Sequence, residues 1–145
     1  MIILSVAIGG ALGSLLRYYL GTINFLSNSV FPVSTFLVNV IGSFAIGILF
    51  FLLKDTNNDY LKSFLMIGVL GGFTTFSAFT IDVLDLFQND QYLISVIYIC
   101  GSVIISLLAV YLGFWITKII NLWMTSIFIV FLKSLPLFDL IDGLK

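Results

Sequence analysis

Long apolar runs separated by short polar segments limit what this chain can fold into. The runs cover about residues 2–20, 33–53, 61–86 and 92–116, and a helix needs about 20 predominantly apolar residues to cross a membrane. Over the whole chain 61% of residues are hydrophobic and 9% are charged, whereas a soluble domain carries about 25% charged residues. The sequence therefore predicts an all-α, multi-pass protein of the cell membrane, with a four-span helical bundle in residues 1–120.

The segment after the fourth run has a different character. A further apolar stretch, residues 119–132, follows Lys118 and is too short to span a membrane comfortably. Residues from Lys133 onward, with Asp139 and Asp142, form a polar end. We treat residues 121–145 as a hydrophobic and polar tail to which the sequence assigns no role, with an interfacial helix as one interpretation.

The third run contains the stretch of the chain that is least suited to a helix. Residues 68–79, GVLGGFTTFSAF, hold three glycines, two threonines and a serine, and glycine costs about 1 kcal/mol relative to alanine in a helix interior. Irregular backbone at membrane depth occurs only against protein or a wet cavity, and interrupted spans form ion and substrate sites. We therefore predict a broken third helix that lines a site. Glycines that only permit close helix packing are the alternative.

Small and polar residues recur at helical spacing on the other spans. Each of three sets shares one helix face: Gly9, Gly13, Arg17 and Gly21 on the first span, Thr35, Asn39 and Ser43 on the second, and Ser95, Tyr98, Ser102 and Ser106 on the fourth. An amide at membrane depth needs hydrogen-bond partners, so Asn39 either joins two helices or borders a pore. Arg17 is either an anchor in the headgroups or a charge that attracts anions at a pore mouth.

The polar groups that are expected to face inward are neutral hydrogen-bond donors. They are Thr35, Asn39, Ser43, Ser77, Thr80, Tyr98, Ser102 and Ser106. The chain has no histidine, no glutamate and one cysteine, so it lacks the ligands of a metalloenzyme and the base of a hydrolase, and we predict that it is not an enzyme. A lining without carboxylates favours an anion. Phe76 and Phe79 could present positive ring edges to it, although such a pair more often only packs.

The sequence resembles the Fluc/CrcB family of fluoride channels over about residues 5–118. The resemblance rests on residues 9–18 (GGALGSLLRY), 34–47 (STFLVNVIGSFAIG) and 68–79, and on a fourth span with Tyr98, Ser102 and Gly113. It implies an antiparallel dimer of four-span subunits with two pores. Through these pores F⁻ would pass down its electrochemical gradient, which lowers cytoplasmic fluoride and confers fluoride resistance.

The resemblance also implies roles for individual residues. The pore residues would be Asn39, Phe76, Phe79, Tyr98 and Ser102, with Thr35, Ser77 and Thr80 as a polar track and Arg17 near the vestibule. A structural Na⁺ at the dimer centre would be held by the backbone carbonyls of Gly71 and Thr74 of each subunit. Carbonyl oxygens suit a hard cation.

The distribution of positive charge bears on how subunits would pair. With four spans the N-terminus, Lys54, Lys62 and Lys118 lie on one side of the membrane and Arg17 lies on the other, which favours a cytoplasmic N-terminus. A subunit that pairs with an inverted copy of itself should be nearly balanced. The partner is therefore either a second copy or a paired homologous subunit of opposite, fixed orientation.

Two other functions stay open from the sequence. A small dual-topology cation or drug transporter would need an embedded acid, for which Asp82 is the candidate, although Asp82 is also interpreted as part of a solvated helix end. A membrane adaptor that transports nothing would use the polar faces only to join helices.

Overall fold

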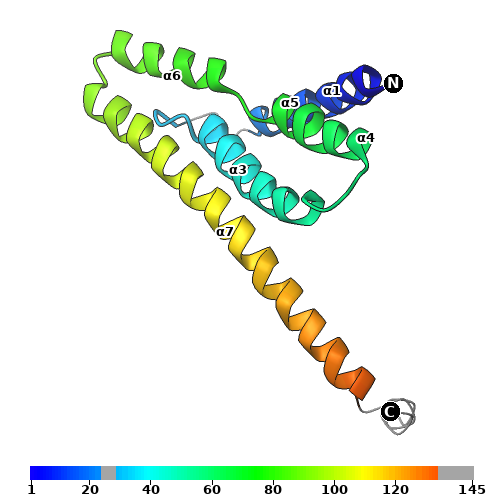
Figure 1. Ribbon diagram of the computed structural model, residues 1–145. Helices are drawn as coiled ribbons and strands as arrows, with labels where there is room; N and C mark the ends of the chain where they lie inside the picture. Colours follow the sequence, from blue (N-terminus) through cyan, green and yellow to red (C-terminus); the bar gives the residue numbers. More distant parts are fainter. Residues whose placement is uncertain (24–28, 134–145) are drawn as a thin grey trace, which may run out of the picture.

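The computed structural model describes residues 1–23 and 29–133, and these ranges contain helices and no strands. The helices are α1 (Ile2–Gly21), α3 (Val33–Leu53), α4 (Asp59–Lys62), the π-helical segment η1 (Ser63–Leu70), α5 (Gly71–Phe73), α6 (Phe76–Gln88) and α7 (Tyr92–Lys133). Figure 1 shows that α4, η1 and α5 form one continuous stretch, and that α6 follows it after a short gap.

Within the described residues, four helical stretches are long and apolar enough to cross a membrane. They are Ile2–Gly21, Val33–Leu53, Asp59–Gln88 and Tyr92–Phe128. The prediction of an all-α, four-span membrane protein is confirmed at this level, and the chain is a multi-pass membrane protein.

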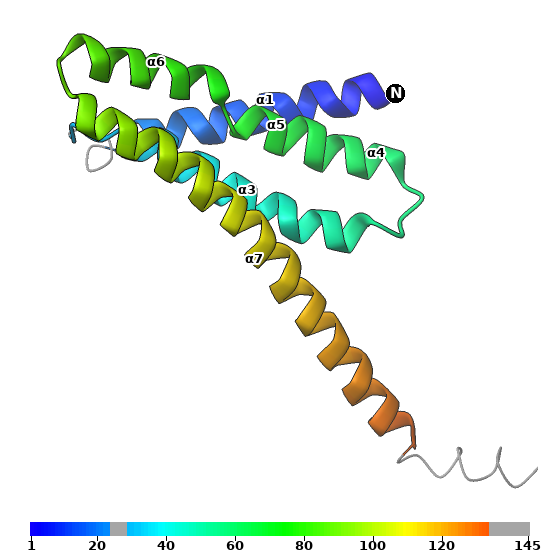
Figure 2. The same cartoon turned by 60° about the vertical axis from the view of Figure 1, so that its left-hand side comes forward.

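α7 continues beyond the fourth apolar run. The sequence predicts that the fourth span ends near residue 116 and that a tail begins at residue 121, and α7 runs through both as one helix of 42 residues that ends at Lys133. Residues 117–133 contain no glycine and no proline, so nothing local stops the helix at Lys118. In Figures 1 and 2, α7 lies along α3 over its first part and then continues away from the bundle.

α1 packs against η1 and α5 through glycines on both sides. A Cβ at Gly9 would lie 2.5 Å from the carbonyl oxygen of Phe64, and a Cβ at Gly72 would lie 2.5 Å from that of Gly10. Gly13 is in equally close contact with the backbone of Val69. The glycine face of the first span is therefore the surface that lets two helix backbones approach each other.

α3 and α7 form the most extensive helix pair, and glycines again set their separation. Gly47 lies against the carbonyl group of Val110, and Gly113 lies against that of Phe44. The predicted inward face of the fourth span is buried, since Ser95 and Tyr98 are fully covered. α6 then packs on α7 through Phe79 and Leu86, which contact Tyr98. This arrangement holds the second half of the third span against the fourth.

Candidate functional site

Two residues between α5 and α6 leave the helical conformation. Thr74 has φ −74° and ψ 155°, and Thr75 has φ −152° and ψ 122°, which are extended values. The N–H and the hydroxyl of Thr74 both donate to the carbonyl oxygen of Leu70, each at 2.9 Å. Thr75 Oγ1 accepts the N–H of Ala78 at 3.1 Å and so caps α6. The two threonines thus satisfy backbone groups on both sides of the interruption.

Asn39 of α3 holds this interruption from the neighbouring span. Its Nδ2 donates to the carbonyl oxygen of Thr75 at 3.0 Å, and its Oδ1 accepts the N–H of Thr75 at 2.8 Å. One side-chain amide therefore satisfies both backbone groups of a residue that has left the helix. Since an amide nitrogen carries two N–H groups, one further donor remains on Asn39.

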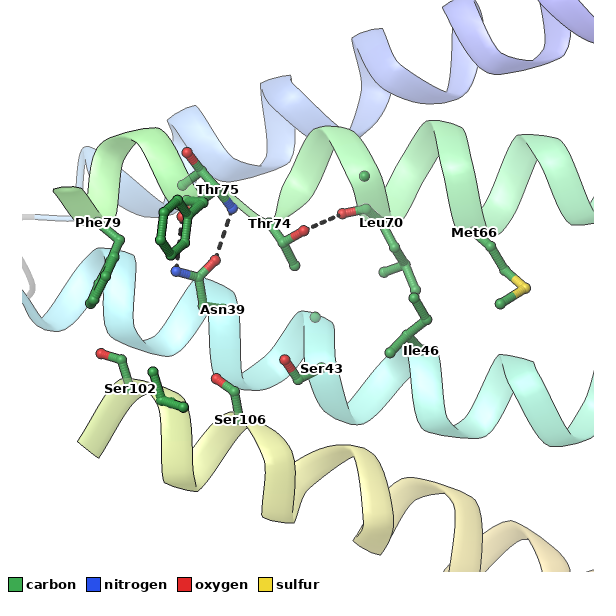
Figure 3. Close-up of a pocket in the computed structure, with 14 residues that line it drawn as sticks. Asn39, Ser43, Ile46, Met66, Leu70, Thr74, Thr75, Phe79, Ser102 and Ser106 are labelled. Atoms are coloured by element: carbon green, nitrogen blue, oxygen red, sulfur yellow. Dashed lines mark hydrogen bonds between the residues drawn. The ribbon is translucent and has the colours of Figure 1, made fainter. Parts of the chain in front are cut away.

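A groove of about 360 Å³ opens beside the interruption, between α3, the third span and α7 (Figure 3). Its described lining consists of Asn39, Gly42, Ser43, Ile46, Met66, Leu70, Gly71, Thr74, Thr75, Phe76, Phe79, Ser102, Val103 and Ser106. None of these lining residues carries a charge, and its polar side chains are hydroxyls and one amide. Figure 3 shows Ser102 and Ser106 of α7 on the wall opposite the interruption. Asn39 of α3 lies between these two serines and the interruption.

Three aromatic rings lead from the open side of the groove into the protein. The centroids of Phe76 and Phe79 are 5.3 Å apart with an interplanar angle of 38°, and those of Phe79 and Tyr98 are 5.2 Å apart at 43°. Phe76 is 75% exposed in the single chain, Phe79 is 8% exposed and Tyr98 is fully buried. The groove is therefore flanked by one buried ring and one ring with most of its surface open.

The hydroxyl of Ser102 is buried in the groove wall without a hydrogen-bond partner. Several other helical hydroxyls of this chain donate to the carbonyl four residues earlier, as Ser14 does to Gly10 at 2.8 Å, whereas the buried hydroxyl of Ser95 also has no partner. An unsatisfied buried polar group costs about 1–3 kcal/mol. An acceptor in the groove would satisfy this donor.

Residues 4–114 match the family model described as CrcB-like protein, Camphor Resistance (CrcB). The chain belongs to the CrcB family.

Three similar proteins are each named Fluoride-specific ion channel FluC. The Helicobacter acinonychis protein is 43% identical over 122 residues, which cover 81% of this chain and 96% of that protein. A Helicobacter pylori protein is 45% identical over 121 residues, 81% of this chain and 93% of its own length. The Flavobacterium psychrophilum protein is 43% identical over 116 residues, 78% and 94% of the two chains.

In this CrcB-family chain, the residues singled out from the sequence do not all lie at the groove. Those in its lining are Asn39, Phe76, Phe79, Ser102, Gly71 and Thr74. Outside the lining are Tyr98, which contacts Phe79, and also Thr35, Ser77, Thr80 and Arg17. The hydroxyl of Thr80 donates to the carbonyl oxygen of Ser77 at 2.8 Å on an exposed part of α6.

Sequence reasoning missed part of the site. The capping role of Thr75 was not predicted, although a threonine just before a helical run is a preferred N-cap. Ser43 and Ser106 were expected to face inward but were given no role, and both line the groove. Asp82 is not simply part of a solvated helix end, because Tyr98 donates its O–H to Asp82 Oδ2 at 3.0 Å in a half-buried position.

Proposed function

We propose that this chain is a fluoride-selective channel that lets F⁻ leave the cytoplasm down its electrochemical gradient, with residues 1–120 as the channel domain. The observation that carries the proposal is the uncharged, donor-lined groove beside Thr74 and Thr75. It lies in a chain 43% and 45% identical to proteins named fluoride-specific ion channels. Such a channel carries out transport and not catalysis.

The lining suits a small anion that must be bound weakly enough to leave. The free N–H of Asn39 and the unpartnered hydroxyl of Ser102 can each donate to F⁻. The rings of Phe76 and Phe79 can add their positive edges. Conduction requires sites that are favourable enough to enter and weak enough to leave, and neutral donors and ring edges meet both conditions.

The same lining argues against a cation or drug transporter. That function needs an embedded carboxylate, and the described lining of the groove contains none. Asp82 lies outside the groove and already accepts a hydrogen bond from Tyr98. The transporter would be favoured if the unmodified protein carried a cation but no fluoride, and if Asp82→Asn abolished that cation flux.

The working unit in this proposal is an antiparallel dimer with the interrupted third helix at its centre. Support comes from Phe76, which is 75% exposed although it borders the groove, and from Gly71, which is also exposed. A second subunit would cover both and close the groove into a pore. The partner is either a second copy of this chain or a paired homologous subunit of opposite orientation.

A structural Na⁺ at the dimer axis completes the proposal. Among the described residues, no group of three or more histidine, cysteine, aspartate or glutamate side chains could hold a metal ion, so the ligands would be backbone oxygens. Gly71 and Thr74 fit this role because both line the groove next to the extended backbone, and a two-fold axis doubles two carbonyls to four. The ion would hold the two interruptions together and supply positive potential near the anion path.

Reconstitution of the purified chain alone tests these proposals together. Proteoliposomes loaded with potassium fluoride, with valinomycin to carry K⁺, should release F⁻ to an external fluoride electrode, and chloride-loaded vesicles should release almost none. Chloride efflux as fast as fluoride efflux would contradict selectivity. A cross-linked dimer without any flux would contradict the channel and favour an adaptor, whereas a silent monomer would indicate that a homologous subunit is required.

A further inference from the structure

α7 is longer than a membrane crossing requires. Its 42 residues extend over about 63 Å at 1.5 Å per residue, whereas a bilayer with its headgroups is about 40–45 Å thick. The excess lies at the C-terminal end, beyond the packing with α3 (Figures 1 and 2). The family match also ends at residue 114, before this part begins. We call residues 119–128, whose side chains the structure describes, the α7 extension.

The α7 extension has an apolar and exposed surface. Between 48% and 68% of the surface of each large apolar side chain is uncovered: Ile119, Ile120, Leu122, Trp123, Met124, Ile127 and Phe128. At about 100° per residue these side chains occupy most of the helix circumference. A helix that pairs with a protein partner needs a narrower apolar stripe. The breadth of this surface favours lipid as what covers it.

Residues at and just before the start of the α7 extension are typical anchors of a membrane–water interface. Trp115 lies before the extension and Trp123 lies within it, and tryptophan is enriched at that interface. Lys118 lies between them, with its Nζ 4.7 Å from the centroid of the Trp115 ring. A lysine beside an aromatic ring can keep its stem in the apolar layer and its charge among the headgroups. These residues mark where α7 reaches the headgroups.

The hydroxyl groups of this part of α7 do not need water. Thr117 donates to the carbonyl oxygen of Gly113 at 2.8 Å, Thr125 to that of Asn121 at 2.9 Å and Ser126 to that of Leu122 at 2.8 Å. The side chains that still require a polar environment are Lys118 and Asn121, which lie three residues apart on one face. The polar stripe is therefore narrow and lies on a single side.

A helix that is longer than the bilayer is thick can tilt in the membrane, and we propose that α7 tilts so that the α7 extension runs through the membrane interface. Its apolar face contacts the acyl chains just below the headgroups, while Lys118 and Asn121 face the headgroups and water. Its exposed apolar surface continues that of the membrane-crossing part of α7, through Leu112, Ile116 and Ile119, without a polar gap. The lipid that covers the crossing part therefore covers the extension as well.

Cysteine labelling in the full-length protein tests which face is covered. In a Cys100→Ala background, Asn121→Cys and Ile119→Cys, which lie two residues apart and therefore on opposite faces of the helix, are reconstituted in liposomes and treated with a membrane-impermeant maleimide. We expect the outward-facing Asn121→Cys to react roughly tenfold faster than Ile119→Cys, because interfacial helices bury their apolar face below the headgroups. Equal, rapid labelling of both would place the extension in water and overturn the proposal.

Tryptophan fluorescence supplies an independent measurement of depth. Trp115→Phe leaves Trp123 as the single tryptophan of the chain. Its emission should be quenched more strongly by lipids brominated near the headgroup end of the acyl chain than by lipids brominated near its terminus. Stronger quenching by the deeper bromines, or no quenching at all, would contradict an interfacial position. Disulfide cross-linking of Ile119→Cys between copies at high lipid dilution would show that protein, and not lipid, covers the apolar face.

Discussion

Asn39→Asp is the most informative substitution, because it keeps the shape of the side chain and changes only its hydrogen bonding and charge. The amide currently donates to the carbonyl oxygen of Thr75 at 3.0 Å and accepts the N–H of Thr75 at 2.8 Å. A carboxylate can accept the second bond but cannot donate the first. The substitution therefore leaves the Thr75 carbonyl unsatisfied, at a cost of about 1–3 kcal/mol.

The larger effect is on the anion. Two like charges about 4 Å apart repel by about 4 kcal/mol at the effective dielectric constant of 20 that is typical of pairs near a protein surface. A barrier raised by that amount slows passage by about a thousandfold, at 1.36 kcal/mol per factor of ten. We therefore expect fluoride efflux from Asn39→Asp proteoliposomes to fall close to the background of empty vesicles.

The control for this experiment is the same chemical change away from the groove. Asn121→Asp places a carboxylate on the α7 extension, outside the groove lining, and should leave fluoride efflux within about twofold of the unmodified protein. Both variants must elute from size-exclusion chromatography as the unmodified protein does. Efflux from a correctly folded Asn39→Asp within threefold of the unmodified rate would show that F⁻ does not pass Asn39, and would refute the proposed pathway.

Three further predictions follow from the same contacts. Phe79→Ile removes the buried ring of the groove wall and should lower fluoride efflux at least about tenfold. Phe128→Ile, on the exposed α7 extension, is the control and should not lower it. Equal efflux rates from the two variants would show that Phe79 does not border the pathway. Ser102→Ala deletes a hydroxyl with no partner, so the thermal unfolding midpoint in detergent should stay unchanged or rise by a few degrees. Fluoride efflux should fall severalfold. A large drop in the unfolding midpoint would show that the hydroxyl makes a structural hydrogen bond. Gly13→Val should destabilise the fold by about 1–3 kcal/mol, because the new side chain meets the backbone of η1. Gly21→Val, which has nothing within 4 Å, is its control in the same unfolding assay.

Hydropathy and spacing were enough to predict much of the fold. Lipid does not satisfy backbone hydrogen bonds, so each long apolar run must form a helix, and the four spans follow from composition alone. The glycine spacing on the first span likewise predicted a contact face, because any side chain at Gly9 or Gly13 would hold the helices apart. Residues 68–79, the poorest helix formers, contain the point at which Thr74 and Thr75 become extended.

What the sequence by itself determined are local properties: which segments enter the membrane, which faces carry small or polar residues, and where the backbone prefers to leave a helix. The tertiary structure decided which groups meet. Asn39 finds its partner 36 residues away, and Tyr98 turns its hydroxyl to Asp82. Outside the groove lining lie Thr35, Ser77 and Thr80, for which the family resemblance implied a polar track. The physical reason is that helical periodicity assigns a residue to a face, while the packing of one helix on another determines whether that face meets a neighbour, a groove or lipid.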